Sequence, residues 1–382
     1  MKTQTFKPHH RKLAQAVALG ILALAANQTQ ATTYDFSDLG TITGPYTGTS
    51  AVANAINNLG QVAGNNSQNA LVWNGNTTTQ LDKLPGQAGA HFGKAINDAG
   101  QIAGYNLNAA GTDVLNPIRW DGTAATQLDG GELAWGMGIN NHGQIAGMNW
   151  ITLSTHTIRW DGTTLTDLEP LSGTAWSQGW DINDAGQVVG NADLPDGSAY
   201  HAILWDNNTR TDLGTLGGTN SDAHAINEAG QIVGWSHLAD GETTHAVLWN
   251  GATLTELAAL GETGTFSTAE TINNAGQIAG YSEITAGSSH ATLWEGDGLI
   301  DLNNFLPADL AAAGWVLTQA KGINDHGVIV GWATNSLDPA TALSAAFKLT
   351  PSAVPVPGAV WLFGSALAGF IGMSRRKQAL AA

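Results

Sequence analysis

Short apolar runs separated by polar turns recur along most of the chain. A block of the form small-Ile-Asn-x-x-Gly-Gln-(Ile/Val)-(Ala/Val)-Gly occurs seven times, and only the last copy replaces the Gln, by Val328. The isoleucines of the block lie 40 to 51 residues apart, at Ile56, Ile96, Ile139, Ile182, Ile226, Ile272 and Ile323. Self-similarity at such a period indicates successive copies of one supersecondary unit.

Each repeat predicts four short β-strands. The segment Asn227-Glu228-Ala229-Gly230 places a glycine where a tight turn needs a left-handed residue, and it separates two apolar segments. A third strand is expected at Ala202–Trp205, and a fourth, after another turn, at Arg210–Leu213. Helical periodicity is confined to one turn at Asp309–Ala313. The chain is therefore predicted to be all-β.

Four-stranded units in seven copies predict a seven-bladed β-propeller over residues 32–350. The seventh repeat ends after its third strand, Ala346–Leu349, whereas Phe36–Gly40 near the N-terminus matches the fourth-strand segment Thr211–Gly214. The N-terminal strand can therefore complete the last blade and close the ring without an unpaired edge. The alternative is an open β-solenoid, which would more naturally end in capping repeats.

The third-strand segments point to a known family. Three of them open with His201-Ala202, His245-Ala246 and His290-Ala291, followed by Ile, Val or Thr, while repeats one, two and seven lack the histidine. In this the repeats resemble the HAF family of extracellular repeats, named for a His-Ala-Phe in each unit. The resemblance covers about residues 34–350. It implies an extracellular location and a repeat scaffold rather than a particular chemistry.

Residues 1–31 have the features of a secretory signal peptide. The apolar segment Leu13–Ala26 follows a basic start and precedes small residues at Thr29-Gln30-Ala31, with Ala23-Leu24-Ala25 as a second cleavage option. The basic residues are Lys2, Lys7, Arg11 and Lys12. A permanent membrane span needs about 20 apolar residues, and this run has fourteen. We therefore expect export and cleavage by signal peptidase.

Residues 351–382 have the features of a different targeting signal. Val354-Pro355-Val356-Pro357 precedes an apolar stretch over Gly358–Met373 and a basic cluster at Arg375–Lys377. Such an order predicts a short, late membrane insertion. It also resembles the PEP-CTERM sorting tail of Gram-negative bacteria, with Val356 in place of the glutamate. The resemblance implies processing by an exosortase and a link to exopolysaccharide and biofilm. The expected sorting residues are Pro355, Pro357, Arg375, Arg376 and Lys377.

Charge and composition limit the partners. All 31 Asp and Glu lie between Asp35 and Asp338, whereas only seven of the 14 Lys and Arg lie in the body of the chain, between the basic start and the basic cluster near the C-terminus. Because an acidic surface repels phosphate backbones, nucleic acid is not an expected partner. The chain has no cysteine, which excludes disulfides and thiolate sites.

No motif predicts a catalytic residue, a metal or a cofactor. The aligned histidines lie a whole blade apart, so we expect each to bond a neighbouring strand rather than to share a metal. The best local carboxylate pair for a cation is Asp193-Leu194-Pro195-Asp196-Gly197, which also fits an ordinary turn. Nucleophile-elbow, zinc-protease and phosphate-loop motifs are absent from the sequence.

The positions that break the repeat carry the candidate site. Six tryptophans share one repeat position and are expected in the core between blades: Trp73, Trp120, Trp160, Trp205, Trp249 and Trp294. Counting back from each isoleucine, positions −1 and −3 are nearly always small, as crowding around an axis requires. Position −2 varies freely: Asn54, Lys94, Met137, Trp180, His224, Glu270 and Lys321. If the first strand is innermost, these side chains surround one mouth of the channel.

The candidate ligand-binding residues combine aromatic and polar side chains, which suit a sugar ring. They are Trp135, Trp176, Trp180, His224, Glu270, Trp315 and Lys321. The sequence thus favours a non-enzymatic protein of the cell surface or extracellular matrix that binds polysaccharide. The alternative is a polysaccharide lyase or glycosidase that uses Glu270, His224 and Lys321. Hydrolysis needs a second carboxyl group, for which Asp222 and Asp181 are the nearest in sequence.

Overall fold

The computed structural model describes residues 33–40, 50–111, 114–130, 133–151, 154–168, 176–207, 209–241, 243–261, 266–335, 337 and 344–352. The chain divides into two compact units, residues 35–350 and residues 1–34 with 351–382. Of the second unit four residues are described, and within it Thr33 Oγ1 lies 2.9 Å from Ser352 Oγ. The predicted signal peptide lies outside the described residues, as do the sorting residues Pro355, Pro357, Arg375, Arg376 and Lys377.

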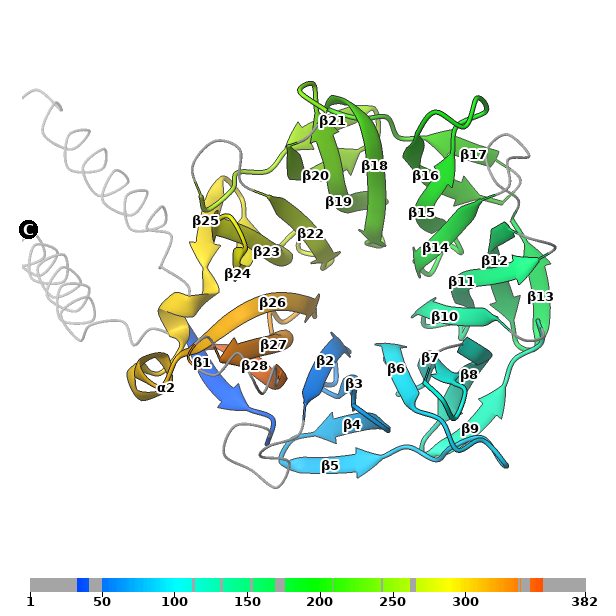
Figure 1. The fold of residues 1–382 in the computed structure, drawn as a ribbon, viewed down its shortest axis with the longest axis horizontal. Coiled ribbons are helices and arrows are strands. Elements are labelled where there is room, and N and C mark those ends of the chain that lie inside the picture. Colours follow the sequence, from blue (N-terminus) through cyan, green and yellow to red (C-terminus); the bar gives the residue numbers. More distant parts are fainter. Residues whose placement is uncertain are drawn as a thin grey trace, which may run out of the picture. The chain divides into compact units, whose positions relative to one another are not determined.

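The described residues form seven antiparallel sheets of four strands, which are the blades of a β-propeller (Figure 1). Blades one to three are β2 (Ala51–Ile56), β3 (Val62–Asn66), β4 (Ala70–Asn74) and β5 (Thr77–Gln80); β6 (His91–Ile96), β7 (Ile102–Leu107), β8 (Val114–Asp121) and β9 (Ala124–Gln127); and β10 (Ala134–Ile139), β11 (Ile145–Ile151), β12 (Ser154–Asp161) and β13 (Thr164–Asp167). Blades four and five are β14 (Ser177–Ile182), β15 (Val188–Asp193), β16 (Tyr200–Asp206) and β17 (Thr209–Asp212); and β18 (Gly217–Ile226), β19 (Gln231–Leu238), β20 (Thr244–Asn250) and β21 (Thr253–Glu256).

Blade six is β22 (Ser267–Ile272), β23 (Ile278–Thr285), β24 (Ser288–Glu295) and β25 (Gly298–Asp301). A 3₁₀ turn, η1 (Leu302–Phe305), and a short helix, α2 (Ala308–Ala312), follow it. The one helical turn that the sequence predicts is therefore confirmed. In the described part of the chain, no helix is long and apolar enough to cross a membrane.

The seventh blade is completed by the N-terminal strand, as the sequence predicts. Its order is β1 (Thr33–Asp38), β28 (Ser344–Ser352), β27 (Ile329–Asn335) and β26 (Trp315–Ile323), and Figure 1 shows blue β1 beside orange β28. The Leu39 N–H donates to Ala346 O at 3.1 Å. The indole N–H of Trp73 in blade one donates to Leu39 O at 3.0 Å. The ring is closed, and the open solenoid is not the observed architecture.

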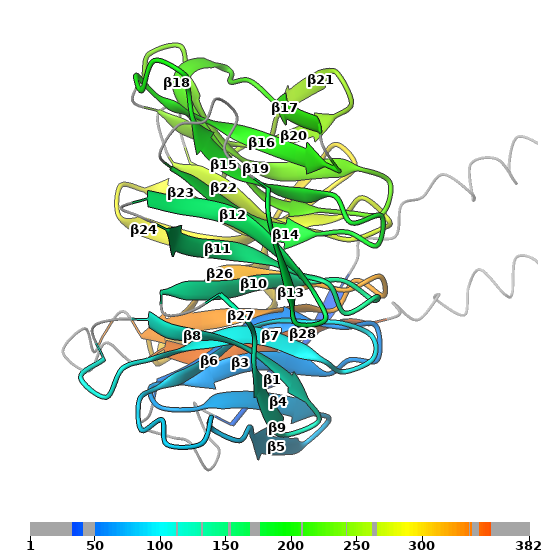
Figure 2. The ribbon, with the colours of Figure 1, turned by 90° about the vertical axis from the view of Figure 1, so that its right-hand side faces the viewer.

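The first strands of the blades are innermost, as expected. Each contacts the first strand of the next blade, and β26 contacts β2, so that seven contacts close a circle around the axis. Figure 2 shows the same ring from the side. The third-strand tryptophans lie outside this circle, between blades. All six are at most 4% exposed; the cluster around Trp120, for example, joins Ala63 of blade one to Ile118 of blade two. The predicted inter-blade core is confirmed.

The same side-chain contacts hold the turn of the hairpin block in six of the seven blades. In blade five Asn227 Oδ1 accepts the Gln231 N–H at 2.9 Å, and its amide donates to Gln231 Oε1 at 2.8 Å. Gly230 has φ of +74°, the left-handed turn conformation that the sequence predicts. The paired Asn and Gln of the block therefore fix the turn between the first two strands.

Candidate functional site

Every innermost strand carries a β-bulge at the position that varies freely in the sequence. The pairing register shifts between positions −3 and −1 in all seven blades. The residue at position −2 is the extra residue of the bulge. Because a bulge leaves its extra residue unpaired and re-aims its side chain, this position is free of ladder constraints and can carry any side chain.

The seven bulge residues line one cavity on the axis. It has a volume of about 290 Å³ and is lined by Asn54, Lys94, Met137, Trp180, His224, Glu270 and Lys321. We call this the axial cavity. A narrower space of about 150 Å³ continues from it to the isoleucine ring. A third, of about 180 Å³, lies at the opposite mouth and is lined by the asparagines of the block.

The structure brings together four of the seven predicted site residues. Trp180, His224, Glu270 and Lys321 line the axial cavity. Trp135, Trp176 and Trp315 do not line it. Trp135 pairs with Met148 on the neighbouring strand, and Trp315 pairs with Asn335 at the start of β26, eight residues before the end of that strand. These tryptophans precede the bulge in sequence, and only the bulge turns a side chain into the cavity.

A chain of polar contacts runs through blades seven, six, five and four. Lys321 Nζ donates to Glu270 Oε2 and lies 5.6 Å from the centre of the Trp332 ring. Glu270 Oε2 is 3.7 Å from His224 Nδ1, and Asp222 Oδ2 is 3.6 Å from His224 Nε2. The Trp180 indole N–H then donates to Asp222 Oδ1 at 3.0 Å. We call this sequence of contacts the paired arc.

Burial and charge oppose each other within the paired arc. Burial alone would raise the pKa of Glu270, but the charges of Lys321, His224 and Lys94 lower it below its usual value. Burial would lower the pKa of His224, but Glu270 and Asp222 raise it. The arc therefore favours ionised Glu270 and protonated His224, which stabilise each other.

Lys94 and Asn54 form the opposite side of the cavity and are not part of the arc. The Asn54 amide donates to Gly93 O at 2.7 Å and to Asn65 Oδ1 at 3.0 Å, which fixes it beside Lys94. The Lys94 ammonium has no hydrogen bond or ion pair with the described residues. Burial, and then the like charge of Lys321, lower its pKa to about 8, while Glu270 partly offsets them. Both residues occupy position −2, the feature by which the sequence could have added them to the predicted site.

A row of aromatic side chains crosses blades four and five next to Asp222 of the paired arc. Trp235 is the cross-strand partner of Asp222, and its ring centre lies 6.1 Å from that of Tyr200. Tyr200 in turn lies 5.7 Å from Trp176, and His237 lies 5.3 Å from Trp235. Of this aromatic row the sequence predicted only Trp176. The other rings stand on second and third strands, so no shared repeat position marks them.

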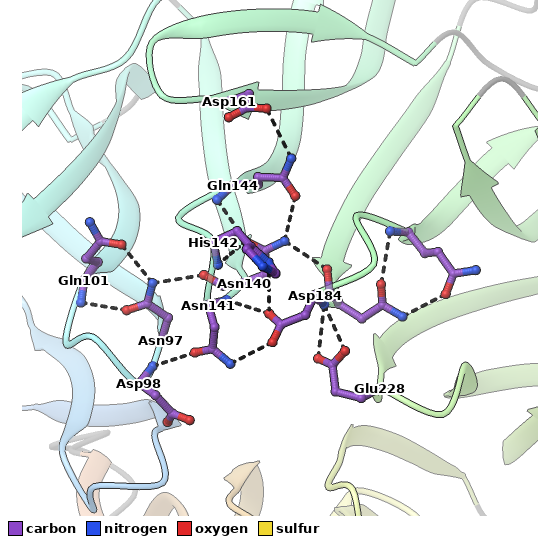
Figure 3. A network of polar contacts seen from close by, with 12 residues as sticks. Asn97, Asp98, Gln101, Asn140, Asn141, His142, Gln144, Asp161, Asp184 and Glu228 are labelled. Carbon is purple, nitrogen blue, oxygen red and sulfur yellow. Dashed lines mark hydrogen bonds and ion pairs between the residues drawn. The ribbon is translucent and has the colours of Figure 1, made fainter.

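The opposite mouth of the channel is held by two closed rings of hydrogen bonds, part of which Figure 3 shows. In the first ring each block asparagine donates to the backbone carbonyl of its counterpart in the next blade, from Asn57 to Asn97 and finally from Asn324 back to Asn57. The next residues form the second ring: Asn58, Asp98, Asn141, Asp184, Glu228, Asn274 and Asp325. These polar groups bond one another and so join each blade to the next.

The histidines of the third strands bond their neighbours, as expected. His201 Nδ1 lies 2.9 Å from Asp212, and His290 Nδ1 lies 2.7 Å from Asp301 on the adjacent fourth strand. Burial would raise the pKa of Asp212, but the hydrogen bonds from His201 and Gly214 lower it. No group of three His, Asp or Glu side chains within the described ranges converges as metal ligands would.

The other carboxylates named from the sequence have structural partners. Asp196 accepts the Ser198 N–H at 3.0 Å, the turn contact that the sequence favoured over a cation site. Asp181 accepts the Ile226 N–H at 3.0 Å and so joins blade four to blade five. Burial raises the pKa of Asp181 to about 6. Asp181 lines the narrower space below the axial cavity and not the cavity itself.

Comparison with known proteins identifies the fold alone. No protein-family model and no curated protein matches the chain. The β-propeller domain of the Trilobed protease from Pyrococcus furiosus has a TM-score of 0.51 at 12% identity, covering 78% of this chain and 93% of that one. Acylaminoacyl peptidase from Pyrococcus horikoshii has 0.47 at 11%, over 75% and 49%. A variant of Aleuria aurantia lectin with α-methyl-L-fucoside has 0.37 at 13%, over 69% and 95%.

Proposed function

We propose that this protein is a non-enzymatic binding scaffold of the cell surface or extracellular matrix that holds a unit of extracellular polysaccharide in the axial cavity. One observation carries the proposal. Seven side chains that the repeat leaves unconstrained meet around one cavity of about 290 Å³. They place an indole, Trp180, beside ammonium, imidazole, amide and carboxylate groups. Sugars are bound by this combination, since the ring faces stack on aromatics and the hydroxyls need hydrogen bonds.

The aromatic row supports a polymer rather than an isolated sugar as the ligand. It begins at Trp235, the cross-strand partner of Asp222, and continues through Tyr200 and Trp176, with ring centres 5.7 to 6.1 Å apart. Successive units of a chain could contact successive rings while one unit occupies the cavity. Aromatic side chains supply such contact area at a low cost in conformational entropy.

The two ends of the chain supply the location. Signal peptidase would remove residues 1–31, and an exosortase would process the tail at 351–382 after transient membrane insertion. Replacing Pro355 and Pro357, or Arg375–Lys377, should leave export intact and trap unprocessed protein in the inner membrane. Mass spectrometry of the C-terminus measures this. An intact C-terminus on wild-type protein from cells would contradict the sorting step.

Binding is tested with a glycan array, followed by calorimetry on any hit. Trp180→Phe keeps a smaller stacking ring and loses the N–H that Asp222 accepts, whereas Trp180→Ala loses both the ring and the N–H. We expect Trp180→Ala to weaken binding by about 2 kcal/mol, as for loss of an aromatic hot spot, and Trp180→Phe to weaken it less. Trp294→Phe, in the inter-blade core, is the control for lost stability. If all three variants bind with the affinity of the wild-type protein, the axial cavity is not the binding site.

The enzyme alternative has one observation in its favour. Lys94, with a pKa of about 8, could act as a general base near neutral pH. A glycosidase fits less well, because the general acid needs a raised pKa and that of Glu270 is lowered. Incubating bound polysaccharide with the protein and assaying new reducing ends separates the two functions. Chain cleavage that Lys94→Met abolishes would establish the enzyme.

A further inference from the structure

The charged side chains of the axial cavity fall into two groups: those that have a partner of opposite charge and one that has neither a hydrogen bond nor an ion pair. In the paired arc each charged group faces a partner of opposite charge: Lys321 has Glu270, and His224 lies between Glu270 and Asp222. Lys94 has no hydrogen bond or ion pair with the described residues, and the carboxylate whose charge acts on it, that of Glu270, is already paired with Lys321. Burial weakens the hydration of this half-buried ammonium, and no described side chain bonds it in compensation. The cavity thus contains one cation that is available to a ligand.

The surroundings of Lys94 fix what the missing partner should look like. Asn54 donates both amide hydrogens, to Gly93 O and Asn65 Oδ1, so its own Oδ1 is the atom that can accept a hydrogen bond from a ligand. Met137, on the other side, offers only an apolar wall. A ligand that suits this side has one negative charge for Lys94 and a hydroxyl for Asn54. Across the cavity, Trp180 offers an aromatic surface for the rest of the ring.

We propose that the axial cavity selects a sugar unit bearing a carboxylate, a uronic acid, and that Lys94 is the specificity-determining residue that binds this carboxylate. The inference rests on the proposed function, since it names the sugar class held by the same cavity. One unpaired ammonium calls for one negative charge, which a uronate carries. A phosphate monoester carries nearly two charges at neutral pH and would leave the second without a partner.

The proposal predicts a particular pH dependence. The titratable groups that share the axial cavity with Lys94 are Lys321, Glu270 and His224; the neighbouring β2 and β10 contribute the non-ionising Asn54 and Met137. Lys94 loses its proton at about pH 8. Uronate affinity should therefore fall up to tenfold per unit as the pH rises above that value. Lys94→Arg keeps its charge at every pH tested and should retain binding with a flatter profile.

The experiment measures binding of methyl hexuronides of gluco, galacto and manno configuration to the purified full-length chain by calorimetry. Each uronide is compared with its neutral hexoside, its uronamide and a sugar sulfate of the same ring. We expect at least tenfold preference for one uronide over its neutral and amide counterparts. Lys94→Met should abolish that preference, whereas Lys348→Met, on β28 and outside the cavity lining, should retain it.

Each outcome has one interpretation. Equal binding of uronide, uronamide and hexoside, or an unchanged preference in Lys94→Met, overturns the carboxylate assignment and leaves sugar binding standing. Stronger binding of the sulfate than of the uronide overturns the choice of carboxylate. If the array and all the monosaccharides fail to bind, the proposed function itself fails. Thermal melts of both lysine variants verify that each is folded.

Discussion

At the scale of single residues, the bulge position differs from its neighbours because packing between blades does not restrict its side chain. Residues on either side of it pack against neighbouring blades: a Cβ on Gly138 would lie 2.8 Å from Asp181 Cα, and one on Gly179 would lie 2.8 Å from Gly147 O. Contact between blades thus favours small residues at −1 and −3, with Asp181 and Thr271 as the exceptions at −1, and the −1 contact is the axial crowding that the sequence predicted. Position −2 escapes this constraint. Its side chains can therefore be chosen for the ligand, at some expense in stability.

Lys94 should show that expense directly. Its pKa is lowered from 10.5 to about 8, so below pH 8 the folded state holds an ammonium that the unfolded state hydrates better. At about 1.4 kcal/mol per pKa unit, the shift corresponds to a penalty on the order of 3 kcal/mol. Lys94→Met, which copies the residue of blade three, should stabilise the ligand-free protein by about 2 kcal/mol at neutral pH.

The gain should depend on pH with a definite sign. Between pH 8 and 10.5 the unfolded state binds more protons than the folded state, so wild-type stability rises with pH. The advantage of Lys94→Met is then full below pH 8 and lost by about pH 10.5. Denaturant unfolding at several pH values measures it, with Lys348→Met as the control. A pH-independent difference between the two proteins would mean that Lys94 is not buried as a cation.

At the scale of the element, the block sequence specifies one bulged hairpin. Its Asn and Gln pair across the turn, and its last glycine faces the bulge. In blade five a Cβ on Gly234 would lie 2.0 Å from Asp222 O, and the six equivalent glycines have the same close approach, at 1.8 to 2.1 Å. The seventh blade has Val328 in place of the Gln. There Asn324 still accepts the Val328 N–H but lacks the side-chain acceptor.

Substitution of two glycines in one hairpin should separate these roles. Gly234→Ala places a methyl group against the Asp222 carbonyl, and the strand must move. We expect a loss of about 3 kcal/mol or more in the free energy of unfolding. Gly230→Ala meets nothing within 4 Å and suffers only from its positive φ, so about 1 kcal/mol is expected. Thermal or denaturant melts compare them, and similar losses would contradict the close approach at the bulge.

At the scale of the whole molecule, the ring is held by closure at two radii. Near the axis the asparagine ring joins every blade to the next, from Asn57 round to Asn324. At the periphery β1 supplies the strand that the last repeat lacks. Both devices link the two ends of the repeat array. Neither would be satisfied in an open array, where a terminal blade has an unpaired edge.

Removing β1 tests the peripheral closure. Deletion of residues 32–44 exposes β28 as an edge strand and removes Leu39, which is buried with Trp73 and Ala346. We expect a lower melting temperature and aggregation, because an unpaired apolar edge can pair with another chain. The control removes residues 1–31 alone. A deletion variant that stays monomeric with an unchanged melting temperature would rule out this role of β1.

The sequence by itself determined the architecture, because the fold is periodic. Seven equal blocks predict seven equal hairpins, the shared tryptophans predict the core between blades, and the missing last strand predicts closure by the N-terminus. The repeat also marked position −2 as unconstrained, which found the cavity lining. Each of these follows from comparing one repeat with the next.

Only the tertiary structure decided how the cavity side chains are partnered. Glu270 contacts Lys321 and approaches His224 because blades five, six and seven are neighbours around the axis, although the three residues lie 46 and 51 positions apart along the chain. The Lys94 side chain, at the bulge of blade two, is left without a hydrogen bond or ion pair to the described residues. The aromatic row also combines residues at different positions of the repeat, since Trp176 precedes a first strand whereas Trp235 lies on a second strand. Comparison of the repeats predicts the backbone that they share, whereas ligand recognition depends on the side chains in which they differ.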